Sequence, residues 1–493
     1  MATIIEQKPK FQNMPVGQNV IFAVSNNPIV ANQTKVKFIA EVHISKEDPP
    51  NLSTATNKIG TFKVTPNNKG IGIFDFSSIL ENYVKADNMG SLDGNGSDFK
   101  GTNTINYPHA IHIIDKYSRN DNTVAWLAIQ FKLEYLGAED CSGNQDDNVV
   151  RIPCSQAVNS VNYALWNGYI KETDTLTFSG VSRQNFGYEW KDRFLLNGTT
   201  QEFLTNAPDT QYANDGDYGT IAFITPEIFN QTVMDRIKFT FYSAAGISIG
   251  TEVVMRSWTN GAFSGGLTQS LASLRLMYFG CFPGNLRNWS TTFQNLILAQ
   301  TIEGGYYTIQ AMNNVTPVSK LYTIYVNCPS ATTVDGSDWV KKELQYDPIR
   351  LCWLNQWGVW DYYTFNKKSV TSIKTKGSTY TQLEGTWNES TFKLHGYKGG
   401  KKSFRVNATE MIKMNTDFIS QDNNTMLEEL VNSPEVYMLK GYHTDPTDST
   451  LNTYVTPVRL TTSSFTKKTV GNDRLIQYTF EVEKSKTLRT QSI

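Results

Sequence analysis

Apolar and polar residues alternate with a period of two along much of the chain. In segment 127–135 every odd-numbered residue is apolar, and three of the four even-numbered residues are polar. Segments 235–242 and 475–482 show the same pattern, and Gly471, Asn472 and Asp473 form a turn signal that joins the second of them to residues 464–470. Because successive side chains of a strand point to opposite faces, this pattern predicts strands that are covered on one side.

Similar short strands recur from residue 17 to residue 483, separated by Gly, Asn, Pro and Asp. A parallel sheet would need regular helical crossovers, so this spacing favours antiparallel sandwiches. We therefore predict an all-β, mainly antiparallel fold of tandem immunoglobulin-like or fibronectin-like β-sandwich domains with few short helices. The best helix candidate is segment 425–431, where Thr425 and Glu428 have capping-box spacing and Ser433 and Pro434 follow. Segment 77–84 is a second, weaker candidate.

Two stretches of looser composition, residues 138–151 and 329–338, predict domain boundaries. The predicted organisation is an N-terminal β-sandwich over residues 1–137, a linker over 138–151, a middle β-sandwich over 152–328 and a C-terminal β-rich domain over 329–493. The last domain carries a tryptophan-rich hairpin and the short helix. Each unit is long enough to bury its own core.

Composition narrows the class of protein. Of the 493 residues only 18% are charged, while 12% are aromatic, which argues against disorder and against a coiled coil. The 45 basic and 46 acidic residues nearly balance, so we expect neither specific nucleic-acid binding nor an anionic membrane surface as partner. No apolar run has the length of a membrane span and the first residues lack a signal peptide. We expect a protein made and kept in a cytoplasm, or one that leaves it without secretion.

The sequence carries no recognisable catalytic or metal-binding motif. It has no G-x-S-x-G elbow, no P-loop and no H-E-x-x-H. His109 and His112 lie on an apolar segment that we predict to be a strand, where positions three apart face opposite sides. The acidic loops 93–98 and 213–218 lack calcium-loop spacing, so solvated loops are favoured over calcium sites. We therefore predict no catalytic residues, no cofactor, no metal site and no enzymatic activity.

The cysteines are odd in number and widely scattered, without C-x-x-C spacing. They are Cys141, Cys154, Cys281, Cys328 and Cys352. This pattern predicts small buried thiols rather than a disulfide framework or a zinc site.

The most distinctive local pattern is an apolar, tryptophan-rich hairpin around residues 348–366. Its two arms flank the segment 355–358, where Gly358 can adopt positive φ and Asn355 can bond its own backbone. The candidate fold and interface residues are Trp353, Trp357, Trp360, Asp361 and Tyr362. If covered, the three tryptophans would form a sandwich core or a subunit contact, and if exposed they would form a sugar-stacking platform. We favour core or interface.

A basic stretch follows the hairpin. Residues 366–413 contain ten Lys or Arg against three Glu, a local net charge of +7. Such a stretch is typical of a solvated face or of a patch that docks an acidic neighbour, and contact with passing DNA is the alternative. The candidate docking residues are Lys393, Lys398, Lys401, Lys402 and Arg405.

The hairpin also carries a resemblance. Its residues Arg350, Leu351, Trp353, Leu354, Asn355, Gly358, Trp360, Asp361, Tyr363 and Phe365 resemble a segment of tail-region structural proteins of tailed phages that infect Bacteroidota, including crAss-like phages. Segments 62–80, 279–286 and 427–437 resemble further pieces of such proteins in the same chain order. The resemblance implies a virion component of a tail ring, collar or baseplate, made in the host cytoplasm.

Together these patterns lead to one main expectation and one alternative. The main expectation is a non-enzymatic structural protein whose partners are copies of itself in a symmetric ring and other tail or portal-proximal proteins, with no membrane contact. The alternative is a carbohydrate-binding receptor-recognition module of a phage tail, which requires exposed aromatic side chains beside amide or carboxyl groups. A polysaccharide-degrading enzyme is a more distant possibility.

Overall fold

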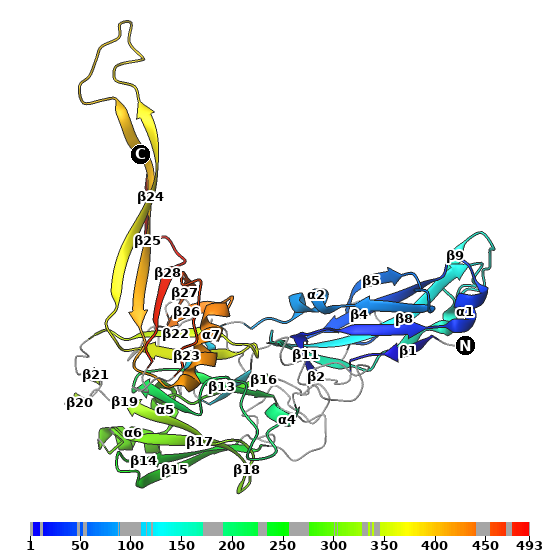
Figure 1. Cartoon of the computed structure of the whole chain (residues 1–493), viewed down its shortest axis with the longest axis horizontal. Helices are drawn as coiled ribbons and strands as arrows, with labels where there is room; N and C mark the ends of the chain where they lie inside the picture. The colour runs from blue at the N-terminus through cyan, green and yellow to red at the C-terminus, as the bar shows by residue number, and fades with distance from the viewer. Residues whose placement is uncertain are drawn as a thin grey trace.

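The fold is built mainly of strands, with few and short helices, as the alternating pattern predicts. The computed structural model describes residues 3–9, 13–46, 50–52, 57–86, 88, 110–114, 116–119, 122–170, 191–224, 234–255, 276–299, 301–302, 304–327, 334–335, 338–339, 346–439, 454–469 and 476–492. The all-β fold class is therefore confirmed for these residues. Figure 1 shows an N-terminal unit on one side, a central body, and a long hairpin that rises from the body.

The first unit consists of two facing sheets. The smaller sheet is antiparallel and contains β1 (Ile4–Gln7), β3 (Ile21–Ser25) and β6 (Ile71–Asp75). The larger sheet has the order β2 (Asn13–Gly17), β11 (Tyr163–Tyr169), β8 (Val124–Leu136), β4 (Lys37–Ser45) and β5 (Lys58–Val64), with β9 (Val150–Arg151) and β10 (Val158–Asn159) also paired to β8. The short helical segments of this region are α1 (Asn27–Asn32), α2 (Ser77–Leu80), and the 3-10 turns η2 (Glu81–Tyr83) and η4 (Cys154–Gln156). Phe22, Phe38 and Phe131 pack between the sheets and are fully buried.

The predicted linker 138–151 is part of the first unit, because it connects β8 of the larger sheet to β9, which pairs with β8. Strand β9 pairs with β8, and Cys141 and Cys154 form a disulfide across the connection. The polar composition marks a surface turn, in which the Asp140 carboxylate accepts hydrogen bonds from the backbone N–H groups of Ser142 and Asn144. Strand β11, which lies within the predicted middle domain, also pairs with β8. The domain boundary predicted at 138–151 therefore falls inside a continuous sheet.

The middle unit packs a six-stranded sheet against a three-stranded one. The six-stranded sheet has the order β12 (Thr210–Asn214), β19 (Tyr322–Asn327), β17 (Tyr306–Asn313), β14 (Arg236–Tyr242) and β15 (Ser248–Met255), with β18 (Thr316–Pro317) paired to β17. The smaller sheet has the order β13 (Thr220–Ile224), β16 (Leu276–Gly280) and β7 (Tyr117–Arg119). The helices are α4 (Lys191–Phe194), α5 (Pro283–Trp289) and α6 (Thr291–Leu298). Strand β7 comes from the first unit, together with η3 (Ile111–Ile113), so the first unit completes a sheet of the second.

The C-terminal unit is one large antiparallel sheet. Its order is β23 (Trp360–Phe365), β22 (Ile349–Leu354), β26 (Val436–Leu439), β27 (Val455–Leu460), β28 (Thr479–Lys484), β25 (Gly400–Asn415) and β24 (Val370–Gln382), with β29 (Arg489–Ser492) paired to β25. The other elements are the short pair β20 (Val334–Asp335) and β21 (Asp338–Trp339), the turn η7 (Gln421–Asn423) and helix α7 (Asn424–Asn432). Helix α7 confirms the helix predicted at 425–431, but Asn423 is its N-cap and Glu428 instead pairs with Lys467, so no capping box forms.

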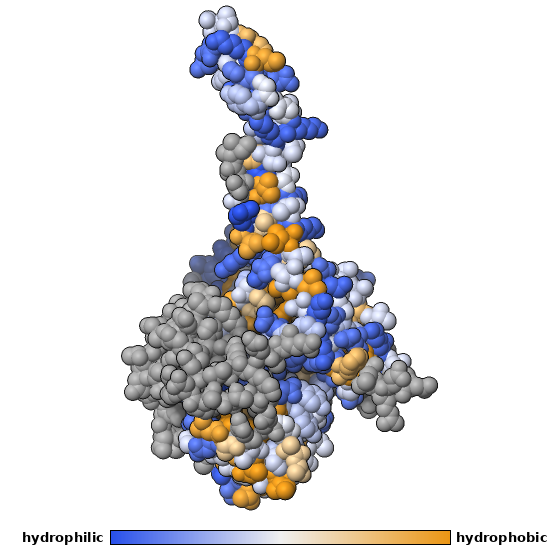
Figure 2. Space-filling view, turned by 90° about the vertical axis from the view of Figure 1, so that its left-hand side faces the viewer, coloured by the Kyte–Doolittle hydropathy of each residue, from blue (hydrophilic) through white to orange (hydrophobic). Residues whose placement is uncertain are grey.

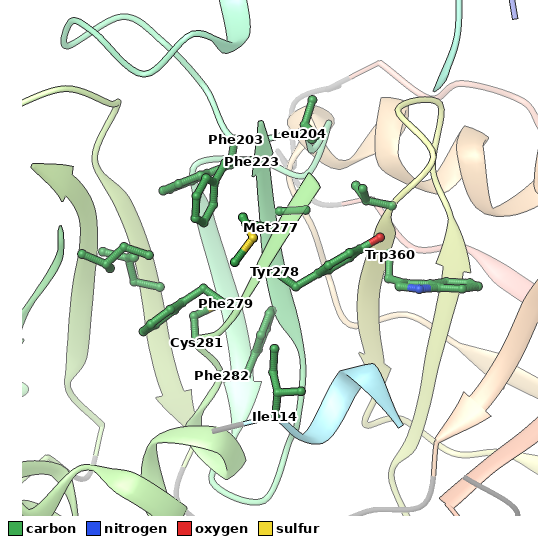
Figure 3. Close-up of a cluster of buried hydrophobic side chains, with 14 of the residues drawn as sticks. Ile114, Phe203, Leu204, Phe223, Met277, Tyr278, Phe279, Cys281, Phe282 and Trp360 are labelled. Carbon is green, nitrogen blue, oxygen red and sulfur yellow. The ribbon is translucent and has the colours of Figure 1, made fainter. Parts of the chain in front are cut away.

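A single hydrophobic core joins the three units. It contains Trp126 and Trp166 of the first unit, Phe239 of the middle unit and Trp360 of the C-terminal hairpin. Figure 3 shows its centre, where strands β13 and β16 lie between the middle sheet and the β22–β23 hairpin, and the Tyr278 ring extends toward Trp360. Strand β8 begins three residues before the alternating segment 127–135, and in this added part both faces are covered. Its residues Ala125 and Leu127 face the first sandwich, while Val124 and Trp126 face the shared core.

Candidate functional site

The tryptophan-rich hairpin turns where the sequence predicts. Gly358 has φ of +73°, and the Asn355 side chain accepts hydrogen bonds from the backbone N–H groups of Trp357 (2.9 Å) and Val359 (3.2 Å). A Cβ at position 358 would lie 1.4 Å from the carbonyl oxygen of Asn167 in β11. The backbone N–H of Tyr169 also donates to the Gln356 carbonyl at 2.7 Å. The turn therefore docks tightly against the edge of the first unit.

The five candidate residues of this hairpin are all buried. Trp353 is fully buried and faces helix α7, whereas Trp360 and Tyr362 face the core that the three units share. Trp357 donates its indole N–H to the Asn206 side chain at 3.2 Å and packs edge-on against Phe194. At most 2% of any of these three tryptophans is exposed. They therefore offer no face to a sugar or to another chain, and the sugar platform considered for them is wrong.

An ion pair lies in the centre of the shared core. The guanidinium of Arg350 lies 3.3 Å from Asp217, and it donates hydrogen bonds to the Thr364 hydroxyl and the Tyr218 carbonyl, each at 2.7 Å. It also stacks over the rings of Phe282 and Tyr362. Loss of either partner would leave a buried charge without compensation, so the pair contributes to the contact between the middle unit and the hairpin only while both residues are present.

His112 connects the first unit to the same core. Its Nε2 donates to the Asn88 side-chain oxygen at 2.8 Å, so its Nδ1 accepts from the Tyr362 hydroxyl, also at 2.8 Å. Burial, together with the nearby charge of Arg350, lowers the pKa of His112 to about 3. His112 lies on the 3-10 turn η3, so the prediction of a strand histidine is wrong, and His109 lies outside the described residues.

The adjacent Asn285 holds the η3 segment in place. Its amide donates to the carbonyl oxygens of His112 (2.9 Å) and Ile114 (2.7 Å), and its own carbonyl accepts from the backbone N–H of Gly219 at 2.9 Å. Asn285 is fully buried, and all three hydrogen bonds join different segments. Its role could not be predicted from the sequence, because a single asparagine inside the short helix α5 belongs to no recognisable motif.

Asp361 belongs to a second buried network. Its carboxylate accepts a 2.5 Å hydrogen bond from the Thr205 hydroxyl, and burial raises its pKa to about 6. The neighbouring Asn206 donates to Glu429 of helix α7 at 2.6 Å. The hairpin, the loop at 205–207 and helix α7 are thus linked by polar contacts. The buried thiols of Cys281 and Cys352 have raised pKa values because burial disfavours the thiolate. The polar contacts therefore join three separate segments of the chain, and the two thiols are kept in their protonated form.

The exposed candidate site is the hairpin formed by β24 and β25, which we call the arm. Beyond the body, β24 is exposed from Val370 to Thr379, and Figure 2 shows the arm standing clear of the rest of the molecule. Strand β29 pairs with β25 only between Arg405 and Ala408. The arm is therefore most exposed in its outer half, whereas most of β25 between Val406 and Asn415 is half-buried or buried.

All five candidate docking residues lie toward the far end of this arm. Lys393 and Lys398 lie in the end region 383–399, which we call the tip, and Lys401, Lys402 and Arg405 lie on β25 next to it. Lys393 pairs with Glu389 at 3.2 Å, and Lys398 lies over the Tyr397 ring. Residues 370–415 carry eight basic and three acidic side chains. The structure therefore brings the basic candidates together on one projecting element.

The tip also exposes large apolar side chains, which sequence analysis did not single out. Trp387 is 87% exposed, Tyr397 74%, Leu394 70% and Phe392 62%. Soluble proteins rarely expose such a group of apolar side chains unless a partner covers it. The signal in the sequence was weak, because Trp387 is separated from the other three residues and no periodicity connects them.

The predictions for the acidic loops and for the cysteines have different outcomes. The carboxylates of loop 213–218 form ion pairs, Asp217 with Arg350 and Asp215 with Arg287, and loop 93–98 lies outside the described residues. Within the described ranges no group of three His, Cys, Asp or Glu side chains could hold a metal ion. Cys141 and Cys154 are exposed and joined by a disulfide, so the prediction of buried thiols is wrong for them. The prediction holds for Cys281 and Cys352, and Cys328 lies outside the described residues. No helix in the described part of the chain is both long and apolar enough to span a membrane.

Comparisons with known proteins give no family. No family model and no curated protein matches the chain. Among solved structures, the chain is similar to Rst D1-D2, with 12% identity and a TM-score of 0.18 over 66% of this chain and 100% of that one. It is also similar to trypsin-activated alpha-2-macroglobulin from Escherichia coli, with 7% identity and a TM-score of 0.16 over 97% of this chain and 23% of that one. These scores are too low to support an argument about fold or function.

Proposed function

We propose that the chain is a non-enzymatic structural component of a phage tail, in a ring, collar or baseplate, and that the arm is its principal contact surface. The exposed apolar tip is the observation that carries the proposal. An isolated two-stranded hairpin is marginally stable in water, and burial of a large apolar side chain contributes about 1.5–3 kcal/mol. A tip with five such side chains, of which Leu383 is the fifth, is suited to be covered by another virion protein.

The buried contacts among the three units support the same role. Buried networks around Arg350, His112 and Asp361 fix three units to one another, so that the arm projects from a firm base. The resemblance of the hairpin sequence to phage tail proteins gives the assembly context. We also propose that the first unit is an immunoglobulin-like sandwich, with the chain located in the virion and made in the host cytoplasm.

The experiment that tests this function uses phage particles. In the tip-deleted variant, residues 383–399 are replaced by an Asn-Gly turn that joins Gln382 to Gly400. We expect the purified variant to keep the melting temperature of the unchanged chain, but to be absent from particles, as measured by mass spectrometry and cryo-electron microscopy. The control is Ile373→Ala, which removes an exposed apolar side chain on the shaft of the arm. Infectious particles that contain the tip-deleted chain in normal amount would contradict the proposal.

A carbohydrate-binding role is the second candidate, and Trp387 is the observation that favours it. This exposed ring is followed by Asn388 and Glu389, residue types that accompany sugar-stacking aromatics. Under this alternative the full chain binds specific oligosaccharides on a glycan array, and Trp387→Ala abolishes the binding while particles still assemble.

A further inference from the structure

A cleft lies between the first unit and the C-terminal unit. Its volume is about 820 Å³, within the range of ligand-binding pockets in proteins. The cleft is lined by η2 and the segment after it, by the ends of β11 and β22, and by the end of α7 with its connection to β26. Its apolar surface comes from side chains such as Val84, Ile170 and Leu354.

The charged residues of the cleft are mostly acidic. Glu81, Glu429 and Glu435 line it, against the single basic residue Lys85, which lies 3.5 Å from Glu435. Glu81 lines the cleft and its side chain is exposed. The cleft thus combines an apolar lining with a net negative charge.

The tip of the arm has the complementary properties. It exposes Trp387, Phe392 and Tyr397. Within the tip two lysines balance two glutamates, but three basic residues follow at once on β25, so the tip and this end of β25, residues 383–405, together carry a net charge of +3. In Figure 1 the arm leaves the body on the side away from the first unit, and its far end lies far from β11 and α7, two of the elements whose residues line the cleft. A contact between tip and cleft is therefore a contact between two molecules.

We infer that the tip of one copy docks in the cleft of the next copy of the same chain. This inference rests on the proposed function and specifies its partner. Because tip and cleft are different surfaces, each copy has one of each to offer, and the contact is head-to-tail. Repetition of such a contact closes into a ring when the rotation between copies is a simple fraction of a turn.

The test uses purified full-length chains and sedimentation velocity with native mass spectrometry. We expect the unchanged chain to form species larger than dimers at micromolar concentration, and Trp387→Ala to weaken the association at least about 30-fold. Lys398→Glu and Glu81→Lys should each weaken it, and the chain carrying both changes should associate again. Lys374→Glu is the matched control, because it makes the same charge change on the shaft of the arm and should have no effect.

Mixing gives a second readout. A chain with Trp387→Ala and a chain with Glu81→Lys each lack one half of the contact, so an equimolar mixture should form dimers and nothing larger. A wild-type chain that stays monomeric, or a double variant that does not recover, overturns the inference. If the tip-deleted chain is then still absent from particles, the tip docks on a different virion protein and the proposed function stands. If the tip-deleted chain is incorporated normally, both the contact between tip and cleft and the proposed function are contradicted.

Discussion

At the scale of single residues, two buried titratable groups near the junction have opposite effects on stability. The pKa of His112 is lowered to about 3 in the folded chain, from 6.5 when unperturbed. The folded state therefore stays neutral where the unfolded state gains a proton, and stability is lost as the pH falls from 6.5 toward 3. The pKa of Asp361 is raised to about 6 from 3.8. Its protonated form is favoured by folding, so its contribution is present below pH 3.8 and is lost as the pH rises through 6.

These opposing contributions give a prediction about pH. Between pH 3.8 and 6 they partly cancel in the unchanged chain. In His112→Asn only the Asp361 contribution remains, so stability should rise on acidification relative to the unchanged chain, by up to about 1.4 kcal/mol per pH unit. Asp361→Asn should show the opposite slope. Denaturant unfolding at several pH values measures both, and groups common to the variants cancel in the difference. Equal slopes of unfolding free energy against pH in the two variants would refute the opposite pKa shifts of His112 and Asp361.

Gly358 supports a second prediction at this scale. Gly358→Ala places a Cβ against the Asn167 carbonyl and forces an L-residue into the left-handed region. We expect the free energy of unfolding to fall by more than about 3 kcal/mol. Gly246→Ala is the matched control, because its φ of +76° is nearly the same but the nearest atom lies 3.9 Å away. The control should lose only about 1–2 kcal/mol, the cost of the backbone conformation. Similar losses in both variants would contradict a close approach at residue 358.

At the scale of elements, the positions of strands could be predicted from the sequence better than the segments that cover their faces. The hairpin at 349–365 and helix α7 lie where the local pattern places them, because turn chemistry and periodicity are local signals. Which face of a strand is covered depends on segments far away in the chain. Trp126 lies just before the alternating segment 127–135, on the same face as Gln130 and Lys132, yet it is buried in a core to which η3, β7 and β11 also contribute. For the same reason the tip of the arm could not be distinguished from an ordinary loop.

The connection between β8 and β9 supports a prediction about the disulfide. Cys141 and Cys154 are separated by 13 residues in sequence, and a cross-link of this span stabilises a fold by about 2–3 kcal/mol. Cys154→Ser should lower the free energy of unfolding by that amount under oxidising conditions, and addition of reductant should then have no further effect on the variant. Mass spectrometry after alkylation without reductant should find Cys141 and Cys154 unmodified in the unchanged chain. Alkylation of both residues in the denatured, unreduced chain would show that the bond is absent.

At the scale of the whole molecule, the three units behave as one body because they share a core. Ile113 belongs to the first unit in sequence, but it is buried where the middle and C-terminal units meet. We predict that Ile113→Asp lowers the melting temperature of the whole chain in a single calorimetric transition. Ile73→Asp makes the same substitution at a position of the first unit that is 52% exposed, and it should leave the transition unchanged. Two separate transitions, with only one of them shifted by Ile113→Asp, would mean that the units unfold independently.

The crossing of η3 and β7 from the first unit into the second has a consequence for how such chains can change in evolution. Modular proteins diversify when recombination exchanges a contiguous stretch of gene that encodes one independent domain. Here an exchange at any point between residues 120 and 190 would separate β7 from its partner strand β16 and Asn285 from the segment that it holds. The first unit can therefore be inherited only together with the rest of the chain, and variation is expected to concentrate on the arm, whose tip can be lengthened or exchanged without disturbing the shared core.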